Sequence, residues 1–355
     1  MAFSEYLTNE LHKQHLNLSQ EAWKTIDNDI FEFTGKNPEK GKSSFLNQVF
    51  MNYHDQESFP GDLDKKISDK REEYRKLLLQ QKELKEKPEL LQEIVDILLE
   101  GYIEQIKQQL QSYPKGIGKK YRIDNDCFRL LCDIPEDGYE TQIYQRPGKY
   151  LKMIFESYSR LSYLQREWIY FYKEVKKLKW AIDYHYEVII ETAGKQYYVA
   201  PYKILPNSLY THYYLVGNSR PVSNVCMNDK EKTVSFRLSR LRVIMVNEKK
   251  KRVLPKKEIE DKISKNGVQF LLCDNEIIQV RLTAEGIRKY NSLLYLRPAY
   301  KEIIEENIYC FTATRRQIMV YFFKFGKDAE IITPDDLRRE FQIAYKEAEE
   351  NYRNG

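Results

Sequence analysis

The order of hydrophobic and polar residues changes character several times along the chain, and it first predicts a strand. From residue 13 to residue 19 the two kinds of residue alternate, with Leu16 and Leu18 on one face and Lys13, His15 and Asn17 on the other. A period of two is typical of a half-buried strand. We therefore expect a strand with an apolar inner face and a polar outer face.

Two helices are predicted directly after this strand. Ser19 is expected to cap a helix that continues through Phe33, and Ser43 or Ser44 is expected to cap a second one after a polar turn. One strand and two helices cannot bury this many apolar side chains, so pairing of the strand with a second copy would supply the missing core.

Residues 1–58 thus resemble a ribbon-helix-helix unit, which is an obligate dimer whose exposed strand face commonly reads the DNA major groove. We expect the unit to serve for dimerisation. DNA reading by Lys13, His15 and Asn17 is the alternative.

Residues 59–177 are expected to form a helical connector. Apolar residues recur at helical spacing over 60–112, and Pro88 divides this stretch into two helices. Its alternating charges indicate a solvated surface. The sequence from Tyr113 to Gly118 breaks the pattern, and an irregular stretch to Pro147 is expected before another amphipathic helix from about Lys149 to Leu178.

From Trp180 the period becomes two, which predicts a β-rich segment over residues 178–250. Strands are expected over 180–190, 196–205, 210–217 and 233–246, with a further one over 268–282. Turn residues such as Ala193-Gly194 and Pro206-Asn207 separate them. Five short strands at this spacing favour a small, strongly bent barrel.

Residues 251–355 are expected to form a C-terminal α/β extension. A helix is predicted over Leu282–Leu296 and a strand over Ile318–Phe325. Thr333 is expected to cap a last helix that has Pro334 at its first position and continues to about Tyr352. The chain is therefore predicted to be an α+β protein of several domains.

Positive charge is concentrated on the predicted β-rich segment. The whole chain carries a formal charge of +5, but residues 170–257 contain 18 Lys and Arg against 7 Asp and Glu, a local +11, whereas residues 62–107 carry −2. The same region is crowded with tyrosine. Basic residues interleaved with aromatic ones are typical of nucleic-acid surfaces, although many of these tyrosines could instead fill the core.

Two strands carry the residues that we expect to bind nucleic acid. If Phe236–Arg240 is extended, Arg237 and Ser239 share one face of the strand. Arg240 then points inward, unless a bulge turns it outward or it lies at the mouth of the barrel. Arginine can pair with phosphate or stack on a base, and tyrosine can stack. Salt bridges and core packing are the alternatives. The candidate residues are Tyr184, Tyr202, His212, Tyr214, Arg237, Ser239 and Arg240.

Nothing in the sequence indicates catalysis, and we expect the protein not to be an enzyme. The five cysteines are scattered without a C-x-x-C pair, and the five histidines add no ligand spacing, so neither a metal nor another cofactor is expected. No apolar run reaches about 18 residues, and the N-terminus lacks a signal-peptide pattern. These features predict a cytoplasmic protein without a membrane contact.

Four short motifs over about residues 178–352 resemble the WYL-domain family, whose members have an Sm-like, SH3-type β-barrel. They are Tyr213-Tyr214-Leu215, Phe236-Arg237-Leu238-Ser239-Arg240-Leu241, Val199-Ala200-Pro201 and the segment from Phe325 to Arg338. Tyr213 stands where the family has Trp, and Ser239 stands where it usually has Asp.

The domain order adds a narrower resemblance, because a ribbon-helix-helix-like start joined to a WYL barrel is similar to the WYL-domain accessory proteins of type VI-D CRISPR systems. This resemblance implies a homodimer that binds single-stranded RNA and stimulates an RNA-guided RNA nuclease. The C-terminal α/β domain is expected to dimerise as well, and the dimer could form through the N-terminus, the C-terminus or both. The alternative is a transcriptional regulator, with an N-terminal ribbon that binds DNA and a WYL domain that senses a ligand or nucleotide.

Overall fold

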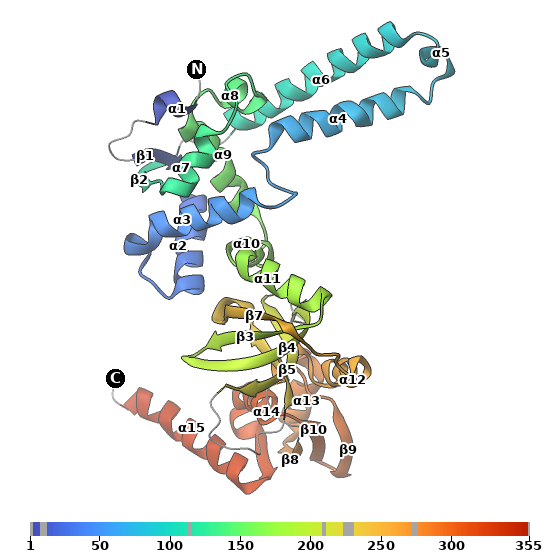
Figure 1. Ribbon diagram of the computed structural model, residues 1–355. Coiled ribbons are helices and arrows are strands. Elements are labelled where there is room, and N and C mark those ends of the chain that lie inside the picture. Colours follow the sequence, from blue (N-terminus) through green and yellow to red (C-terminus); the bar gives the residue numbers. More distant parts are fainter. Residues whose placement is uncertain are drawn as a thin grey trace. The chain divides into compact units, whose positions relative to one another are not determined.

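The chain forms two compact units, Met1–Lys173 and Glu174–Gly355, each with helices and sheets. The computed structural model describes residues 3–7, 13–112, 116–207, 211–222, 231–271 and 276–353 (Figure 1). The predicted α+β class is confirmed. The division into segments 1–58, 59–177, 178–250 and 251–355 is finer than these two units and stays a prediction.

The first unit is built around a two-stranded antiparallel ribbon. Strand β1 (Lys13–Leu18) pairs over its whole length with β2 (Ile117–Arg122) of the same chain. Leu16 and Leu18 are fully buried, as the alternation predicted. The expectation that a second copy must complete this core is wrong, because β2 and the helices that follow it in the same chain supply the missing packing.

Helices cover the inner face of this ribbon. Ser19 caps α2 as predicted, since its hydroxyl accepts a hydrogen bond from the Ala22 amide. The next helix starts earlier than predicted, because Asn37 caps it and neither Ser43 nor Ser44 does. These helices and those that pack with them are α1 (Phe3–Tyr6), α2 (Gln20–Thr34), α3 (Pro38–His54), α7 (Asn125–Cys132), α8 (Tyr139–Tyr144), α9 (Pro147–Arg160) and α10 (Tyr163–Tyr170).

Buried carboxylates tie α2 to the later helices. Glu156 on α9 is 1% exposed, and its two oxygens accept hydrogen bonds from the amide (2.6 Å) and the hydroxyl (2.9 Å) of Ser19. Asp29 accepts from Arg166 Nε at 2.7 Å and from the Tyr158 hydroxyl at 2.9 Å. Burial raises the pKa of Asp29 despite these partners. Each carboxylate therefore joins segments that lie more than 100 residues apart.

A long helical hairpin extends from this unit (Figure 1). It consists of α4 (Leu63–Leu78), the short α5 (Lys82–Lys85) and α6 (Pro88–Gln111), so the predicted division at Pro88 is confirmed. The stretch before Pro147 is not irregular, because it contains β2, α7 and α8. The prediction of a single helix over Lys149–Leu178 is also wrong. This segment contains α9, α10 and α11 (Tyr172–Asp183), and the chain breaks between α9 and α10 where Ser162 and Gln165 form a capping box.

The second unit begins with a five-stranded antiparallel sheet in the order β6-β5-β4-β3-β7. Only residues 238–241 connect β6 to β7, although these strands lie at opposite edges. The five steps from Arg237 to Arg242 reach at most about 18 Å, and a flat sheet of five strands would be about 19 Å wide. The sheet must therefore roll. Its strands are β3 (Tyr186–Thr192), β4 (Lys195–Pro206), β5 (Tyr213–Pro221), β6 (Lys232–Arg237) and β7 (Arg242–Lys251).

The predicted barrel is not closed, since no β6–β7 ladder forms among the described residues. Two of its predicted strands also need correction. Residues up to Asp183 continue α11, so the first strand starts only at Tyr186. The continuous strand predicted over 233–246 is interrupted after Arg237 by a short 3-10 helix, η1 (Leu238–Arg240).

The C-terminal part forms a second antiparallel sheet, in the order β11-β8-β10-β9, over one aromatic-rich core. The strand predicted over Ile318–Phe325 is a helix, because residues 318, 321, 322 and 325 are the buried ones and this spacing is helical. Thr333 ends a strand and does not cap the last helix. The elements are α12 (Lys256–Asn266), η2 (Val268–Phe270), β8 (Glu276–Leu282), α13 (Ala284–Ser292), β9 (Tyr300–Glu305), β10 (Ile308–Ala313), α14 (Arg315–Phe322), η3 (Phe323–Asp328), β11 (Ala329–Thr333) and α15 (Asp335–Arg353).

None of the helices in the described part of the chain combines the length and the apolar character that crossing a membrane would require.

The first unit should depend strongly on Glu156. Its replacement by alanine leaves the buried amide and hydroxyl of Ser19 without their acceptor, which should lower the free energy of unfolding by about 2–4 kcal/mol. Urea denaturation would measure this. The matched control is Glu93→Ala at an exposed position of α6, for which we expect a change within about 0.5 kcal/mol. Equal effects of the two substitutions would contradict a structural role of the buried carboxylate.

Candidate nucleic-acid interface

Four of the predicted site residues come together where β5 begins and β6 ends. Tyr214 of β5 lies directly opposite Arg237 of β6 in the antiparallel register. His212 immediately precedes β5, and its pKa is affected by the charges of both Arg237 and Arg240. We call His212, Tyr214, Arg237 and Arg240 the β5–β6 cluster.

Asn207 holds His212 in place and was missed by the sequence reasoning. Its side-chain oxygen accepts hydrogen bonds from the backbone amides of Thr211 (2.8 Å) and His212 (3.3 Å), and its backbone amide donates to the His212 carbonyl at 3.0 Å. Asn207 is 6% exposed. Asparagine is typical of turns because its side chain can bond the backbone a few residues on, so the Pro206-Asn207 turn signal could have identified it.

The imidazole of His212 is neutral at physiological pH. Burial and, after it, the positive charges of Arg237 and Arg240 lower its pKa from 6.5 to about 4. A neutral imidazole can stack on a base or exchange a hydrogen bond with it, but it adds no charge. The positive charge of this cluster therefore comes from its arginines.

Arg240 is exposed because η1 replaces the predicted continuous strand. In that strand it would have pointed inward with Phe236 and Leu238, which are buried as expected. Among the residues that the structure describes, no carboxylate forms an ion pair with Arg240. Ser239 lies beside it, and its hydroxyl oxygen is buried without a hydrogen bond to a described residue. The turn thus presents a cation to solvent and keeps Ser239 half-buried.

Tyr202 belongs to the core against which Tyr214 of this cluster packs, and Tyr184 lies apart, at the start of β3. Tyr202 is 7% exposed, packs in a core with Val216 and Ile259, and hydrogen-bonds through its hydroxyl to Glu260. Its role is therefore core packing, the alternative that the sequence left open. Tyr184 follows α11 and stacks on Tyr186 (ring centroids 5.7 Å apart), at the start of β3. No described contact joins Tyr184 to the β5–β6 cluster, so its part in a common platform stays a prediction.

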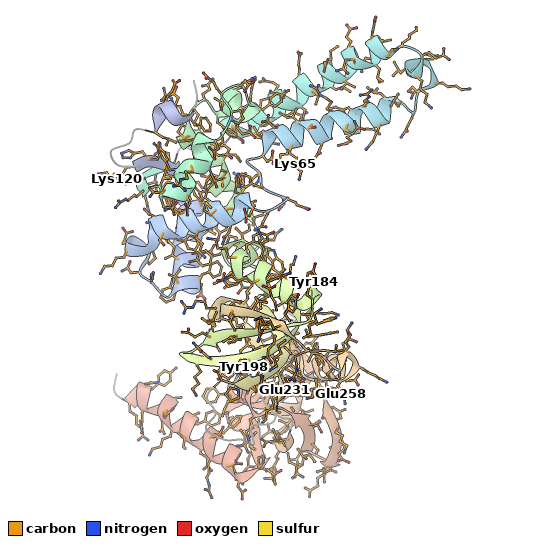
Figure 2. The ribbon with its side chains drawn as sticks, viewed as in Figure 1. Lys65, Lys120, Tyr184, Tyr198, Glu231 and Glu258 are labelled. Carbon is orange, nitrogen blue, oxygen red and sulfur yellow. The ribbon has the colours of Figure 1, made fainter. Side chains whose placement is uncertain are left out.

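Part of the basic charge counted in the sequence is neutralised within the fold. Glu187 is 1% exposed and pairs with Arg220 Nη1 at 3.0 Å and with Lys250 Nζ at 3.1 Å. Arg220 also lies over the ring of Tyr198, 4.3 Å from its centroid, and Tyr198 is labelled in Figure 2. Arg242 pairs with Glu191. A residue count therefore overstates the charge that is available to a polyanion.

The predicted DNA-reading residues lie on the exposed face of the ribbon. Lys13, His15 and Asn17 are exposed, and the register places Lys13 opposite Arg122 and His15 opposite Lys120. Lys120 is labelled in Figure 2. Both β2 residues are exposed as well. The structure therefore adds two cations that a single strand did not reveal.

Within the described residues, no group of three or more His, Cys, Asp or Glu side chains could hold a metal ion. Cys127, Cys132 and Cys310 are free thiols, and burial raises the pKa of Cys127 well above its ordinary value. Cys226 and Cys273 lie outside the described residues, as does Tyr210.

Comparison with solved structures shows the fold over the whole chain. A crystal structure described as that of a CRISPR Cas-related protein matches with a TM-score of 0.71 and 22% sequence identity, over 99% of this chain and 96% of that chain. The proteasome accessory factor B/C of Arthrobacter aurescens matches with a TM-score of 0.26 and 12% identity, over 63% of this chain and 35% of that chain, which is too weak a likeness to support an argument.

No protein-family model matches the sequence. No curated protein matches it either.

The imidazole of His212 should titrate near pH 4 in the folded protein. Because the fold disfavours the imidazolium, this group should lower stability as the pH falls from 6.5 towards 4. NMR of the histidine rings would measure the midpoint. Arg240→Ala removes one of the charges that repel the imidazolium, so it should raise the titration midpoint of His212. Arg288→Ala, an exposed change on α13, should leave this midpoint unaltered. A midpoint at the ordinary value would contradict the burial of this ring.

Proposed function

We propose that this chain is a non-catalytic accessory protein that binds single-stranded RNA and stimulates an RNA-guided, RNA-targeting CRISPR effector. The β5–β6 cluster is the observation on which the RNA-binding part rests. The likeness of the whole fold to a CRISPR Cas-related protein supports the biological setting. The motifs that resemble WYL domains, which include Tyr214, Arg237 and Arg240, supply the link to an accessory role.

The chemistry of the cluster suits unpaired RNA better than a duplex. Arg240 offers an exposed guanidinium for a phosphate, and Arg237 lies one turn before it. Tyr214 and the neutral His212 are half-buried flat groups next to these charges, and Tyr214 also packs against the core of Tyr202 and Val216. Unpaired bases can reach such groups and stack, each contributing about 1–3 kcal/mol, whereas bases within a helix are already stacked on each other.

Arg240→Ala should weaken RNA binding without unfolding the protein, because its side chain is exposed. Loss of one phosphate contact should reduce the slope of log Kd against log salt concentration by about 0.7. Fluorescence anisotropy with a labelled single-stranded RNA would measure it. Arg237→Ala combined with Arg240→Ala should weaken binding further.

Arg288→Ala is the matched control for this experiment, since it removes an exposed arginine from the same unit. It should leave both affinity and salt slope unchanged. If the double variant bound RNA as the wild type does, the β5–β6 cluster would not be the RNA site. Stimulation would be measured as RNA cleavage by the effector with and without this protein.

The proposal includes a homodimer, and the free edge of β9 supports it. Within the residues that the structure describes, β9 pairs on one side with β10 and has no strand on its other side. All six of its residues are exposed, including the apolar Ile303 and Ile304. An exposed apolar edge strand is a ready site for pairing with another chain, and a symmetric pair would bury it.

Ile303→Lys should weaken this dimer at least about tenfold, because each copy would place a charge at the edge that pairs. Light scattering at matched protein concentrations would measure the mass. Val253→Lys, at an 83% exposed position of the same unit, should remain dimeric. A dimeric Ile303→Lys variant would exclude the β9 edge, and a monomeric wild type would exclude the homodimer.

A second candidate function is a DNA-binding regulator, which the ribbon face favours. A two-stranded ribbon fits the DNA major groove, and this one exposes Lys13, His15, Lys120 and Arg122. Specific duplex binding that is lost in a Lys13→Ala, His15→Ala, Lys120→Ala variant, with RNA binding retained, would favour the regulator.

A further inference from the structure

A cavity of about 570 Å³ in the first unit has a strongly basic lining. It lies between the C-terminal part of α6, the helix α8 and the first turns of α9, which are neighbours in Figure 1. Lys107 comes from α6, and Lys149 and Lys152 come from α9. Among the described residues that line the cavity there is no Asp or Glu, so three lysine side chains line one space.

The rest of the lining divides into amide and apolar groups. Gln142 and Gln145 add side-chain amides. Gln142 Nε2 donates to the Asp137 carbonyl at 2.8 Å, which leaves its oxygen for a ligand, and Lys149 Nζ is 3.5 Å from Gln145 Oε1. Ile143 and Met153 are buried and form an apolar wall. A bare inorganic anion would use the lysines and leave this wall uncovered, whereas a ligand with both an anionic and an apolar part would contact both.

The lining of a second described cavity in the same unit has the opposite charge. This second cavity, of about 270 Å³, is lined by Asp62, Asp64, Asp133 and Glu140. Lys107 has an ion pair with Glu104, but the distance is 3.8 Å and both side chains are about half exposed. Exposed pairs of this kind compensate little charge.

We propose that this cavity binds a nucleoside polyphosphate. Its volume lies within the range of about 300–1,000 Å³ that holds small ligands. A single phosphate monoester carries a charge of about −1.5 to −2, so a di- or triphosphate matches three lysines better. The wall of Ile143 and Met153 would take the base, and the glutamine amides would bond its polar edge. The site is independent of the β5–β6 cluster and of RNA binding there.

Isothermal titration calorimetry with the full chain tests the proposal, with ADP, ATP, GDP and inorganic pyrophosphate as probes. We expect saturable binding of the nucleotides, and weaker binding of pyrophosphate because it lacks the apolar part. Lys149→Gln combined with Lys152→Gln should weaken ADP binding at least about tenfold. Lys107→Gln, on a different helix, should weaken it as well.

Lys65→Gln is the matched control, since it removes an exposed lysine of the same unit that lies outside the cavity; Lys65 is labelled in Figure 2. This variant should bind ADP as the wild type does. Thermal unfolding of each variant would show that the unit remains folded. The proposal is overturned if no nucleotide binds saturably, if pyrophosphate binds as tightly as ADP, or if the double variant retains wild-type affinity. Equal losses in Lys65→Gln and the double variant would likewise overturn it, since they indicate non-specific charge.

Discussion

The short connection between β6 and β7 is the constraint on which the second unit depends. Residues 238–241 must carry the chain from one edge of a five-stranded sheet to the other, and the sheet can satisfy this only by rolling. The same turn decides which side chains reach solvent. It buries Leu238, keeps Ser239 half-buried and exposes Arg240. The geometry of the sheet and the chemistry of the β5–β6 cluster therefore have one common cause.

Three buried carboxylates, Asp29, Glu156 and Glu187, show that buried charge has a different role in each unit. In the first unit, Asp29 and Glu156 accept hydrogen bonds from residues distant in sequence and hold the helices in register. In the second unit, Glu187 of β3 binds Arg220 of β5 and Lys250 of β7, so it joins strands that are not adjacent to each other. Burying a carboxylate is costly unless it is fully paired. The lysines and arginines that serve this pairing are therefore not available to a ligand, which narrows the surface that can attract a polyanion.

Local patterns predicted those features that depend on local sequence. The alternation before Ser19, the break at Pro88 and the burial of Phe236 and Leu238 were all predicted and are found. The strand β2 was missed because only Tyr121 of its six residues is buried and its partner lies about 100 residues earlier. The positions of Tyr184 and Tyr202 also depend on contacts that no period reveals, namely a helix that extends to Asp183 and the docking of α12.

The placement of tryptophan gives the two units different optical properties. Trp23 is 3% exposed, and its indole donates a hydrogen bond to the Ile117 carbonyl of β2 at 2.8 Å. Lys119 and Lys42 lie near its ring, 4.7 Å and 5.4 Å from the centroid. Trp180, in the second unit, is 39% exposed. Separation of β2 from the first unit would therefore move a buried indole into water and redden its emission, whereas the emission of Trp180 is already that of a partly hydrated ring. The third tryptophan, Trp168 on α10, is half-buried and also belongs to the first unit. A red shift of the intrinsic fluorescence should therefore be larger when the first unit opens than when the second does.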